Sequence, residues 1–528
     1  MKSRFASFVL IVTLLSGCAT LTPGSDYPKT RSSAFAQPES TQLGKRADKA
    51  AREHAGYSGF RMLPVGVDGF LTRLQMANSA ERSLDLQYYI LRGDETGRLL
   101  ADAVLRAADR GVRVRVLIDD GETIEGDERI AVLGAHPQIE IRIFNPFEYR
   151  GHDKLLRAIE FMVSSARLDY RMHNKLFVTD NAVALVGGRN IGDQYFQVDP
   201  ESQFADDDVF AQGPIVKELS GTFDDYWNSA SAIPVAALLN ANPTDTSLDD
   251  YRKALATHRQ LAKDETDYAS GAASGEPLNG MLTGKLPLVW AHAQLICDSA
   301  EKKGVEKGWV VGSLMRRPVV GAVTAVQSEL LVITPYLIPG SEGMQLLHDL
   351  RQRNVRVRVL TNSLESSEVP IAHAGYMHYR VPLLEDGVEL FEVRSRLGNS
   401  RGSGQSANMS QYGNYSLHAK LFVFDRQRLF IGSMNFDQRS MHLNTEIGLI
   451  IDSPELAQQA AARFDAMVLS ANAYRLTYGP NAVGGSPSLR WHTREGSEVV
   501  VYDQEPAESD WQRTKVHLLT LLPLDKEL

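Results

Sequence analysis

The sequence predicts an α/β (α+β) protein of two pseudo-twofold-related domains, each a mixed β-sheet flanked by helices. Two pairs of internal matches support this prediction. The hexapeptide VRVRVL occurs identically at Val112–Leu117 and at Val355–Leu360, and His173–Asn190 matches His418–Asn435 at eight of eighteen positions. The offset is 243 residues for the hexapeptides and 245 for the histidines. An offset this nearly constant indicates a duplicated domain.

The pattern around each hexapeptide predicts the same local order of elements. A strand-like run (Leu84–Ile90 or Leu330–Thr334) and an amphipathic helical stretch (Leu99–Ala108 or Met344–Arg353) precede each copy. The alternation of Val with Arg in the hexapeptide is itself typical of a strand. Strand, helix and strand in this order favour a parallel or mixed sheet with covering helices.

Composition along the chain suggests where the segments begin and end. Residues 18–59 are rich in Ser, Thr, Pro and Ala, and residues 241–284 are polar apart from a helical pattern at Leu248–Leu261. Residues 476–528 contain a strand-like stretch, Glu498–Tyr502, and an apolar run, Val516–Leu522. In chain order we expect a lipoprotein signal peptide at 1–17, a flexible tether at 18–59, a first domain at 60–240, a linker at 241–284, a second domain at 285–475 and a C-terminal tail packed on the core at 476–528.

The N-terminus indicates export and lipid attachment. Basic residues precede an eleven-residue apolar run, Phe5–Leu15, which is too short to span a bilayer and is typical of a secretory signal. The ending Leu-Ser-Gly-Cys at Cys18 resembles a bacterial lipobox, in which the cysteine receives the lipid. We therefore expect a cell-envelope lipoprotein that faces the periplasm, and Ala19 favours the outer over the inner membrane. With Cys18 lipidated, Cys297 has no cysteine partner, and we expect it to be a buried, inert thiol.

Charge and composition lower the expectation of nucleic-acid binding. The chain has 528 residues, of which 43% are apolar, enough for a substantial core. Its 56 basic and 65 acidic residues give a formal charge of −9, whereas duplex-DNA binding is driven largely by a basic surplus. No later stretch reaches about 18 uninterrupted apolar residues, so no transmembrane helix is predicted. We expect no nucleic acid as a partner, and we leave open whether an accessory protein takes part.

The second pair of matches contains the residues that can do chemistry. Both copies read His-x-Lys-x4-Asp-x6-Gly-[Gly/Ser]-x-Asn. In an extended segment His173 and Lys175 share one face, as do His418 and Lys420. If the halves pack about a pseudo-twofold axis, two imidazoles and two ammoniums converge on one cleft. That set suits a phosphodiester, because lysines offset the growing charge while one imidazole attacks and the other donates a proton. We expect no metal and no other cofactor.

The duplicated motif resembles the phospholipase D superfamily, and its surroundings are similar to the cardiolipin synthase C-like branch. The resemblance spans roughly residues 60–528. The segments that carry it are Gln87–Gly97, Arg171–Asp180, Gly187–Phe196, His373–Arg380 and Gly432–Ile451.

The resemblance implies a role for each matching residue. His173 and His418 would be the catalytic pair, with His173 the nucleophile and His418 the general acid. Asp180 and Asp425 complete the two motifs but would serve structure more than chemistry. The residues that would bind or orient the phosphate are Lys175, Lys420, Asn190, Asn435 and Ser433.

The same resemblance implies that an acidic residue of each half orients the imidazole of the other. Glu446, in the segment NTEIG, fits this role for the second half. In the first half a strict offset of 245 residues indicates Glu201, whereas alignment of FADDDV with NTEIGL favours Asp206. We prefer Asp206 and keep Asp208 as its competitor.

The resemblance implies a phosphatidyltransferase that acts on membrane phospholipids through a phosphohistidine intermediate. Cardiolipin would form from phosphatidylglycerol and a phosphatidylethanolamine or phosphatidylglycerol donor. With water as acceptor the same site would be a phospholipase D, and with another diester a nuclease, which the acidic charge and the anchor disfavour. A catalytically silent membrane-surface scaffold is the alternative from another class, and two intact motifs argue against it.

Several other polar or aromatic residues have simpler interpretations. We expect the four hexapeptide arginines to be solvated and Asp119-Asp120 to form a strand-end turn. Tyr88, Tyr89 and Tyr336 are as consistent with core packing as with lining a cleft.

Overall fold

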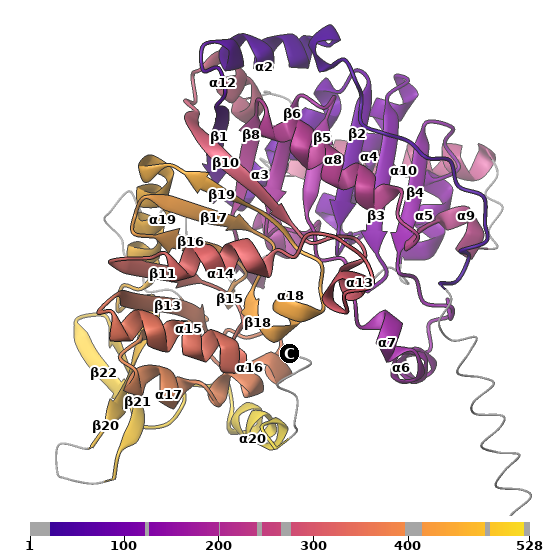
Figure 1. Ribbon diagram of the computed structural model, residues 1–528. Coiled ribbons are helices and arrows are strands. Elements are labelled where there is room, and N and C mark those ends of the chain that lie inside the picture. The colour runs from indigo at the N-terminus through magenta and orange to yellow at the C-terminus, as the bar shows by residue number, and fades with distance from the viewer. Residues whose placement is uncertain are drawn as a thin grey trace, which may run out of the picture.

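The protein folds as two similar α/β halves that share one β-sheet, as the computed structural model shows (Figure 1). It describes residues 22–121, 126–199, 201–239, 245–265, 276–396, 414–480 and 486–521. The expected signal peptide and Cys18 lie outside these residues.

The first half is a mixed sheet of eight strands. Strands β2, β3 and β4 run parallel, and the other neighbouring pairs are antiparallel. The expected strand at Leu84–Ile90 is β2, and the first hexapeptide falls in β3. In spatial order the strands are β9 (Ala232–Pro234), β4 (Ile139–Phe144), β3 (Arg113–Asp119), β2 (Ser83–Tyr88), β5 (Leu176–Thr179), β6 (Val183–Gly187), β8 (Asp208–Gln212) and β1 (Ser58–Leu63).

The second half repeats this order strand for strand, with the same parallel centre. The repeat in the sequence is therefore a repeat in space, and the prediction of two related mixed sheets is confirmed. The strands are β20 (Ala473–Gly479), β14 (Glu389–Val393), β13 (Arg356–Asn362), β11 (Glu329–Ile333), β16 (Leu421–Phe424), β17 (Arg428–Gly432), β19 (Ile447–Asp452) and β10 (Val289–Cys297).

The two sheets are joined edge to edge. The terminal strands β1 and β10 pair antiparallel, with Gly59 opposite Trp290 and Phe60 opposite Val289. At the far end of the second half, β21 (Ser488–Glu495) and β22 (Glu498–Tyr502) extend the sheet to 18 strands. The exact repeat boundaries expected from composition remain a prediction.

Two further crossings connect the halves near the carboxyl ends of their parallel strands. Strand β7 (Ser202–Ala205) of the first half pairs parallel with β15 (Asn414–Leu417) of the second. The counterpart is a single parallel bridge between Met172 and Thr445. Each crossing ends one residue before a motif histidine.

Helices cover both faces of the sheet, and alternation along the strands divides the core. In β5, Phe177 packs with helices α3 and α4, whereas Leu176 and Val178 face the core that α8 and α19 share between the halves. In Figure 1, α8 crosses in front of the first-half strands. The longer helices are α2 (Gln42–Arg52), α3 (Gly66–Ser79), α4 (Glu95–Asp109), α6 (Lys154–Val163), α8 (Ile215–Trp227), α10 (Asp245–Glu265), α14 (Arg316–Thr324), α15 (Gly340–Gln352), α19 (Pro454–Met467) and α20 (Asp510–Leu519).

The shorter helices lie mainly at the ends of the sheet and in its connections. They are α5 (Asp127–Leu133), α7 (Ser165–Leu168), α9 (Val235–Leu238), α12 (Glu276–Thr283), α13 (Lys302–Glu306), α16 (Pro370–Met377), α17 (Arg380–Glu385), α18 (Gln438–His442) and the 3₁₀ turns η1 (Pro38–Ser40) and η3 (Asp193–Phe196). No helix in the described ranges has the length and apolar character needed to cross a membrane.

The segment expected to be a flexible tether is instead folded onto the first half from residue 22 onward. Helix α2 begins at the N-cap Thr41 and buries Leu43 and Ala47. Upstream, Lys29 Nζ donates to Ser229 O at 2.7 Å. The low hydropathy of the segment hid these contacts, because most of them are made by the backbone and by polar side chains.

The expected linker and the hexapeptide arginines also differ from expectation. Helix α10 extends beyond the predicted helical stretch and packs on α4, where Arg259 bonds Asp102 at 2.6 Å. Arg115 is buried rather than solvated, because Asp85 on the neighbouring strand β2 accepts two hydrogen bonds from its guanidinium at 2.7 and 2.9 Å. Of the four hexapeptide arginines, Arg356 is exposed as expected.

The C-terminal tail is fixed to the second half by a buried charge cluster. Glu505 accepts hydrogen bonds from Arg380 and from His373 Nε2, the latter at 2.7 Å. Arg380 also pairs with Glu392, whose other oxygen accepts from the Trp491 indole at 2.9 Å. Burial raises the pKa of Glu505, but Arg380 and His373 outweigh it and hold that pKa well below its usual range.

We predict that Glu505→Gln destabilises the protein by about 3 kcal/mol at pH 7, because it leaves Arg380 as a buried charge with one carboxylate fewer. A carboxylate whose folded pKa is depressed stabilises the fold above its unfolded pKa and loses that effect as the pH falls. The difference should therefore shrink below about pH 4. Urea unfolding followed by circular dichroism measures it. Glu498→Gln, at an exposed position on β22, is the matched control, and equal midpoints for both variants would contradict the prediction.

Candidate active site

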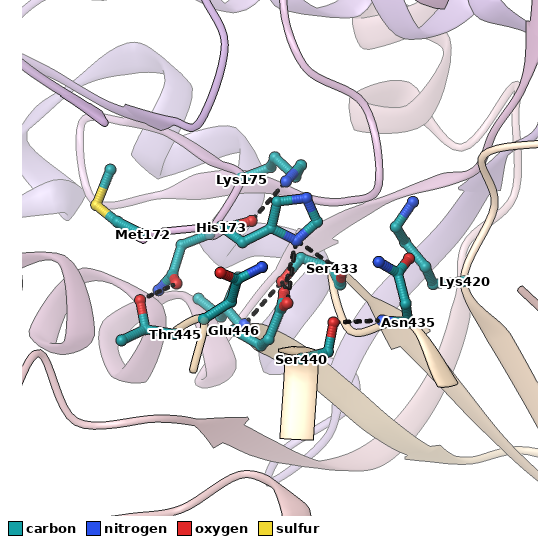
Figure 2. A network of polar contacts seen from close by, with 12 residues as sticks. Met172, His173, Lys175, Lys420, Ser433, Asn435, Ser440, Thr445 and Glu446 are labelled. Carbon is teal, nitrogen blue, oxygen red and sulfur yellow. Dashed lines mark hydrogen bonds and ion pairs between the residues drawn. The ribbon is translucent and has the colours of Figure 1, made fainter. Parts of the chain in front are cut away.

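His173 lies in the extended segment between α7 and β5, and its backbone is held by the other half of the protein. Its amide donates to Thr445 O at 2.9 Å, and the Thr445 amide donates in return to Arg171 O at 2.9 Å. This exchange places the residue after Thr445, which is Glu446, directly beneath the imidazole (Figure 2).

Glu446 and Ser433 orient the ring of His173. Nδ1 lies 2.9 and 3.1 Å from the two carboxylate oxygens of Glu446 and 3.1 Å from the carbonyl oxygen of Ser433. The Ser433 hydroxyl in turn donates to Glu446 Oε2 at 2.5 Å (Figure 2). With Nδ1 occupied by a carboxylate, Nε2 is the ring nitrogen left to react.

His418 is held in the same way by the first half. Its amide donates to Ala205 O at 2.8 Å, and its Nδ1 lies 2.6 Å from Asp206 Oδ2. The competitor Asp208 is engaged elsewhere, with Arg73 at 2.8 Å and Arg189 at 3.2 Å. Glu201 is exposed at the start of the segment that becomes β7. The structure thus places Asp206, of the three candidates, at His418.

Both motif lysines are buried beside the histidines. Lys175 Nζ donates to His173 O at 2.6 Å, and Lys420 Nζ lies 3.1 Å from His418 Nδ1. The edge of the Tyr89 ring meets His173, with 5.1 Å between ring centres, and Lys175 Nζ lies 5.5 Å from the centre of that ring. Tyr89 therefore lines the site, whereas Tyr88 is buried and bonds Arg73.

The two motif asparagines are in different surroundings. Asn190 Oδ1 accepts from the Ile90 amide at 3.2 Å, and Nδ2 donates to the Tyr195 hydroxyl at 2.9 Å. Tyr195 meets His418 edge-on at 5.1 Å, so Asn190 acts on the site through this ring. The backbone amide of Asn435 donates to Ser440 Oγ at 3.2 Å, while the buried side-chain oxygen Oδ1 has no hydrogen-bond partner among the described residues.

The motif aspartates lie away from the imidazoles and hold strands in place. Asp180 accepts from the backbone amides of residues 81, 82 and 83, where β2 begins. Asp425 accepts from the amides of residues 327, 328 and 329, where β11 begins. Each aspartate thus fixes the start of a central parallel strand.

Burial and mutual repulsion disfavour positive charge throughout the site. Burial lowers the pKa of His173 to about 4, assisted by Lys175 and opposed by Glu446. Burial, followed by Lys420 and Lys175, lowers the pKa of His418 well below its usual range. Burial lowers the pKa of Lys420 to about 8 and that of Lys175 well below normal. An anion bound here would be stabilised and would raise all four pKa values.

The two orienting carboxylates differ in their ionisation. Burial raises the pKa of Asp206 to about 6, against the effects of Lys420 and Arg189. Glu446 has its pKa lowered, because His173 and Lys175 outweigh burial. Glu446 therefore remains a carboxylate that keeps the proton on Nδ1 of His173, whereas Asp206 is a weaker acid than an ordinary aspartate.

Sequence reasoning missed several residues of the site. Arg189 binds Asp208 and donates to the Asp206 carbonyl, and it supports the segment that carries the orienting acid. Tyr195 and Phe204 both pack on His418, each with 5.1 Å between ring centres. The GGRN segment contained a signal for Arg189, whereas the aromatic contacts depend on the β7–β15 crossing. Within the described ranges, no three His, Cys, Asp or Glu side chains are grouped as metal ligands would be.

Comparisons with known proteins agree with this geometry. The family model described as "Cardiolipin synthase, PLD-like domain" matches residues 74–227 and 321–468. The chain is 37% identical to cardiolipin synthase C of Escherichia coli over 90% of its own length and 97% of that protein. It is 23% identical to the major cardiolipin synthase ClsA of Bacillus subtilis, covering 76% of this chain and 66% of that one.

The fold is also similar to a solved structure. The phosphatidylserine synthase of Haemophilus influenzae superposes with a TM-score of 0.50 at 14% identity, covering 82% of this chain and 92% of that one. The family model matches once in each half, and the E. coli relative matches along nearly the whole chain. The protein therefore belongs to the cardiolipin synthase family of PLD-like domains, within the phospholipase D superfamily.

Proposed function

We propose that the protein is a phosphatidyltransferase that makes cardiolipin from phosphatidylglycerol and a phosphatidylethanolamine or phosphatidylglycerol donor. The observation that supports this most directly is the pair of imidazoles, each oriented by a carboxylate of the other half. The 37% identity with cardiolipin synthase C supports the choice of lipid substrates.

In the first step, His173 is the nucleophile. Glu446 holds the proton on Nδ1, so the Nε2 lone pair attacks the phosphorus of the donor lipid and forms a P–N bond. The negative charge of the bound diester raises the pKa of His418, so that this ring enters the step as an imidazolium. The P–O bond to the headgroup alcohol breaks, and His418 Nε2 gives its proton to the departing oxygen. The lysines and the side-chain NH₂ group of Asn435 stabilise the non-bridging oxygens.

In the second step, the free hydroxyl of phosphatidylglycerol is the acceptor. His418, now neutral, takes the hydroxyl proton while the oxygen attacks phosphorus and the P–N bond to His173 breaks. The proton is back on His418 and both imidazoles have returned to their starting states. Asp206 accepts the hydrogen bond from Nδ1 of His418 in both states of the ring, so the proton that is given and taken back is the one on Nε2.

A lipid anchor at Cys18 would hold this site at its substrate, on the periplasmic side of the cell envelope and most simply on the outer membrane. The Leu15–Cys18 sequence after a short apolar run supports this proposal. We predict that Cys18→Ser abolishes lipid attachment and changes processing, as measured by membrane fractionation and by the mass of the mature chain. A variant that stays membrane-bound with unchanged processing would contradict it.

The function itself is tested by lipid analysis. Purified protein incubated with vesicles of phosphatidylglycerol and phosphatidylethanolamine should produce cardiolipin, identified by mass spectrometry. His173→Ala should lower its formation by a factor of about 10³ or more, because the nucleophile is lost. His152→Ala, at an exposed histidine outside the motifs, is the matched control. Phosphatidic acid without cardiolipin would indicate a phospholipase D instead.

The histidine assignment predicts different partial reactions for two variants. With a donor that has a good leaving group, His418→Ala should still form the covalent adduct, because little protonation is needed, whereas His173→Ala should form none. Trapping a labelled phosphatidyl group and mapping it by peptide mass separates the two. An adduct on His418 in the His173→Ala variant would reverse the assignment.

A further inference from the structure

Helix α6 has its apolar side turned outward. Side chains at positions i, i+1, i+4, i+7 and i+8 are apolar, the spacing of a single helical stripe. In a globular protein such a stripe normally faces the core. Here Leu155 is 68% exposed, Met162 67% and Val163 70%. The full exposed set on this helix is Leu155, Leu156, Ile159, Phe161, Met162 and Val163.

The polar side of the same helix faces the protein. Arg157 donates to Asp120 O, and its guanidinium lies 3.9 Å from the centre of the Phe147 ring. The Glu160 carboxylate accepts from the amides of residues 148 and 149 at 2.7 and 2.9 Å. Rotating the helix to bury the apolar stripe would break these contacts. The outward stripe is therefore imposed by specific bonds.

A second exposed apolar segment lies in the loop after α13, a helix that contacts α7, the element that follows α6 in the chain. Trp309 is 70% exposed and Val311 fully exposed, in the loop after α13. Figure 1 shows α13 beside α7, and Lys303 Nζ joins them by donating to Ala166 O at 2.5 Å. Lys307 Nζ lies 4.9 Å from the centre of the Trp309 ring. Tryptophan and lysine together are typical of residues at a membrane–water interface.

This exposed surface is directly connected to the site. Arg157 Nη2 contacts the carbonyl groups of residues 120 and 121. The Tyr89 ring packs on Gly121, where an added Cβ would lie 3.0 Å from the hydroxyl, and the same ring also contacts His173. On the same strand end, Asp119 accepts from the Met172 amide at 2.7 Å, one residue before His173.

We propose that α6 and residues 309–311 form a docking surface that inserts into the interfacial region of a phospholipid bilayer. The inference rests on the proposed function for its occupant, because the substrate of that site lies in a bilayer and the surface adjoins the site. A helix with an exposed apolar stripe lies in the plane of the interface and buries that stripe among the headgroups and upper acyl chains. Docking here presents the histidine pair to the lipid headgroups.

The first experiment measures insertion directly. The full chain carrying Met162→Cys or Val499→Cys is labelled with an environment-sensitive nitrobenzoxadiazole probe. It is then reconstituted on vesicles of phosphatidylglycerol and phosphatidylethanolamine with brominated acyl chains. Both positions have nearly equal exposure, 67% and 68%. The probe at 162 should shift to the blue and be quenched, and the probe at 499 should not. A probe at 162 with neither a blue shift nor quenching overturns the proposal. A blue shift without quenching, which is the result expected beneath a bound protein partner, also overturns it. The unsubstituted chain gives the background from its native cysteines.

The second experiment separates docking from catalysis. We expect the combined change Leu155→Gln, Ile159→Gln and Met162→Gln to lower turnover of vesicle phospholipid by about tenfold, because three apolar side chains that docking would bury in the bilayer are lost. Turnover of a short-chain phosphatidylglycerol below its critical micelle concentration should be unchanged. Leu469→Gln, Val499→Gln and Leu518→Gln form the control set, at similarly exposed positions.

Equal loss for both substrates, or no loss for either, overturns the docking surface. Failure of the unsubstituted chain to act on either substrate would instead overturn the proposed function. The fluorescence experiment still decides the docking surface in that case, because it does not depend on turnover.

Discussion

The reciprocal hydrogen bonds between the halves are the constraint on which the site depends. The amide of each motif histidine donates to a carbonyl of the opposite half, at Thr445 and at Ala205, and the next residue in each case is the orienting acid. Each motif histidine is paired with a carboxylate of the opposite half. Strand order, capping aspartates and the shared core all serve to keep these two short crossings in register.

Much of the fold could be predicted from the sequence because duplication makes weak patterns specific. Neither a Val-Arg alternation nor a His-x-Lys motif indicates a fold by itself, but two copies at one offset do. The same symmetry predicted that His173, Lys175, His418 and Lys420 lie in one site. In the structure each lysine lies beside the histidine of its own motif, and the first motif is close enough to act on the charge of the second. Glu446 followed from its fit to the family pattern.

What the sequence could not supply depended on contacts between distant segments. Asp206 and Asp208 are the same residue type, two positions apart, so the sequence does not distinguish them. In the structure Asp208 is already paired with two arginines, which leaves Asp206 for His418. Arg115 looked solvated because the carboxylate that buries it lies on another strand. Residues 22–59 lacked an apolar pattern, and their backbone hydrogen bonds to the first half leave no trace in composition.

The pairing of β1 with β10 has a consequence for how the two halves can exist. Each of these strands would be a bare outer edge in a separated half, with its row of amides and carbonyls open to any other strand. Since the two halves have the same strand order, the uncovered edge of a lone half would be open to a second copy of itself. Joining the halves in one chain covers each edge with the other half, and it lets the two copies of the site carry different residues, as they do at Asp206 and Glu446.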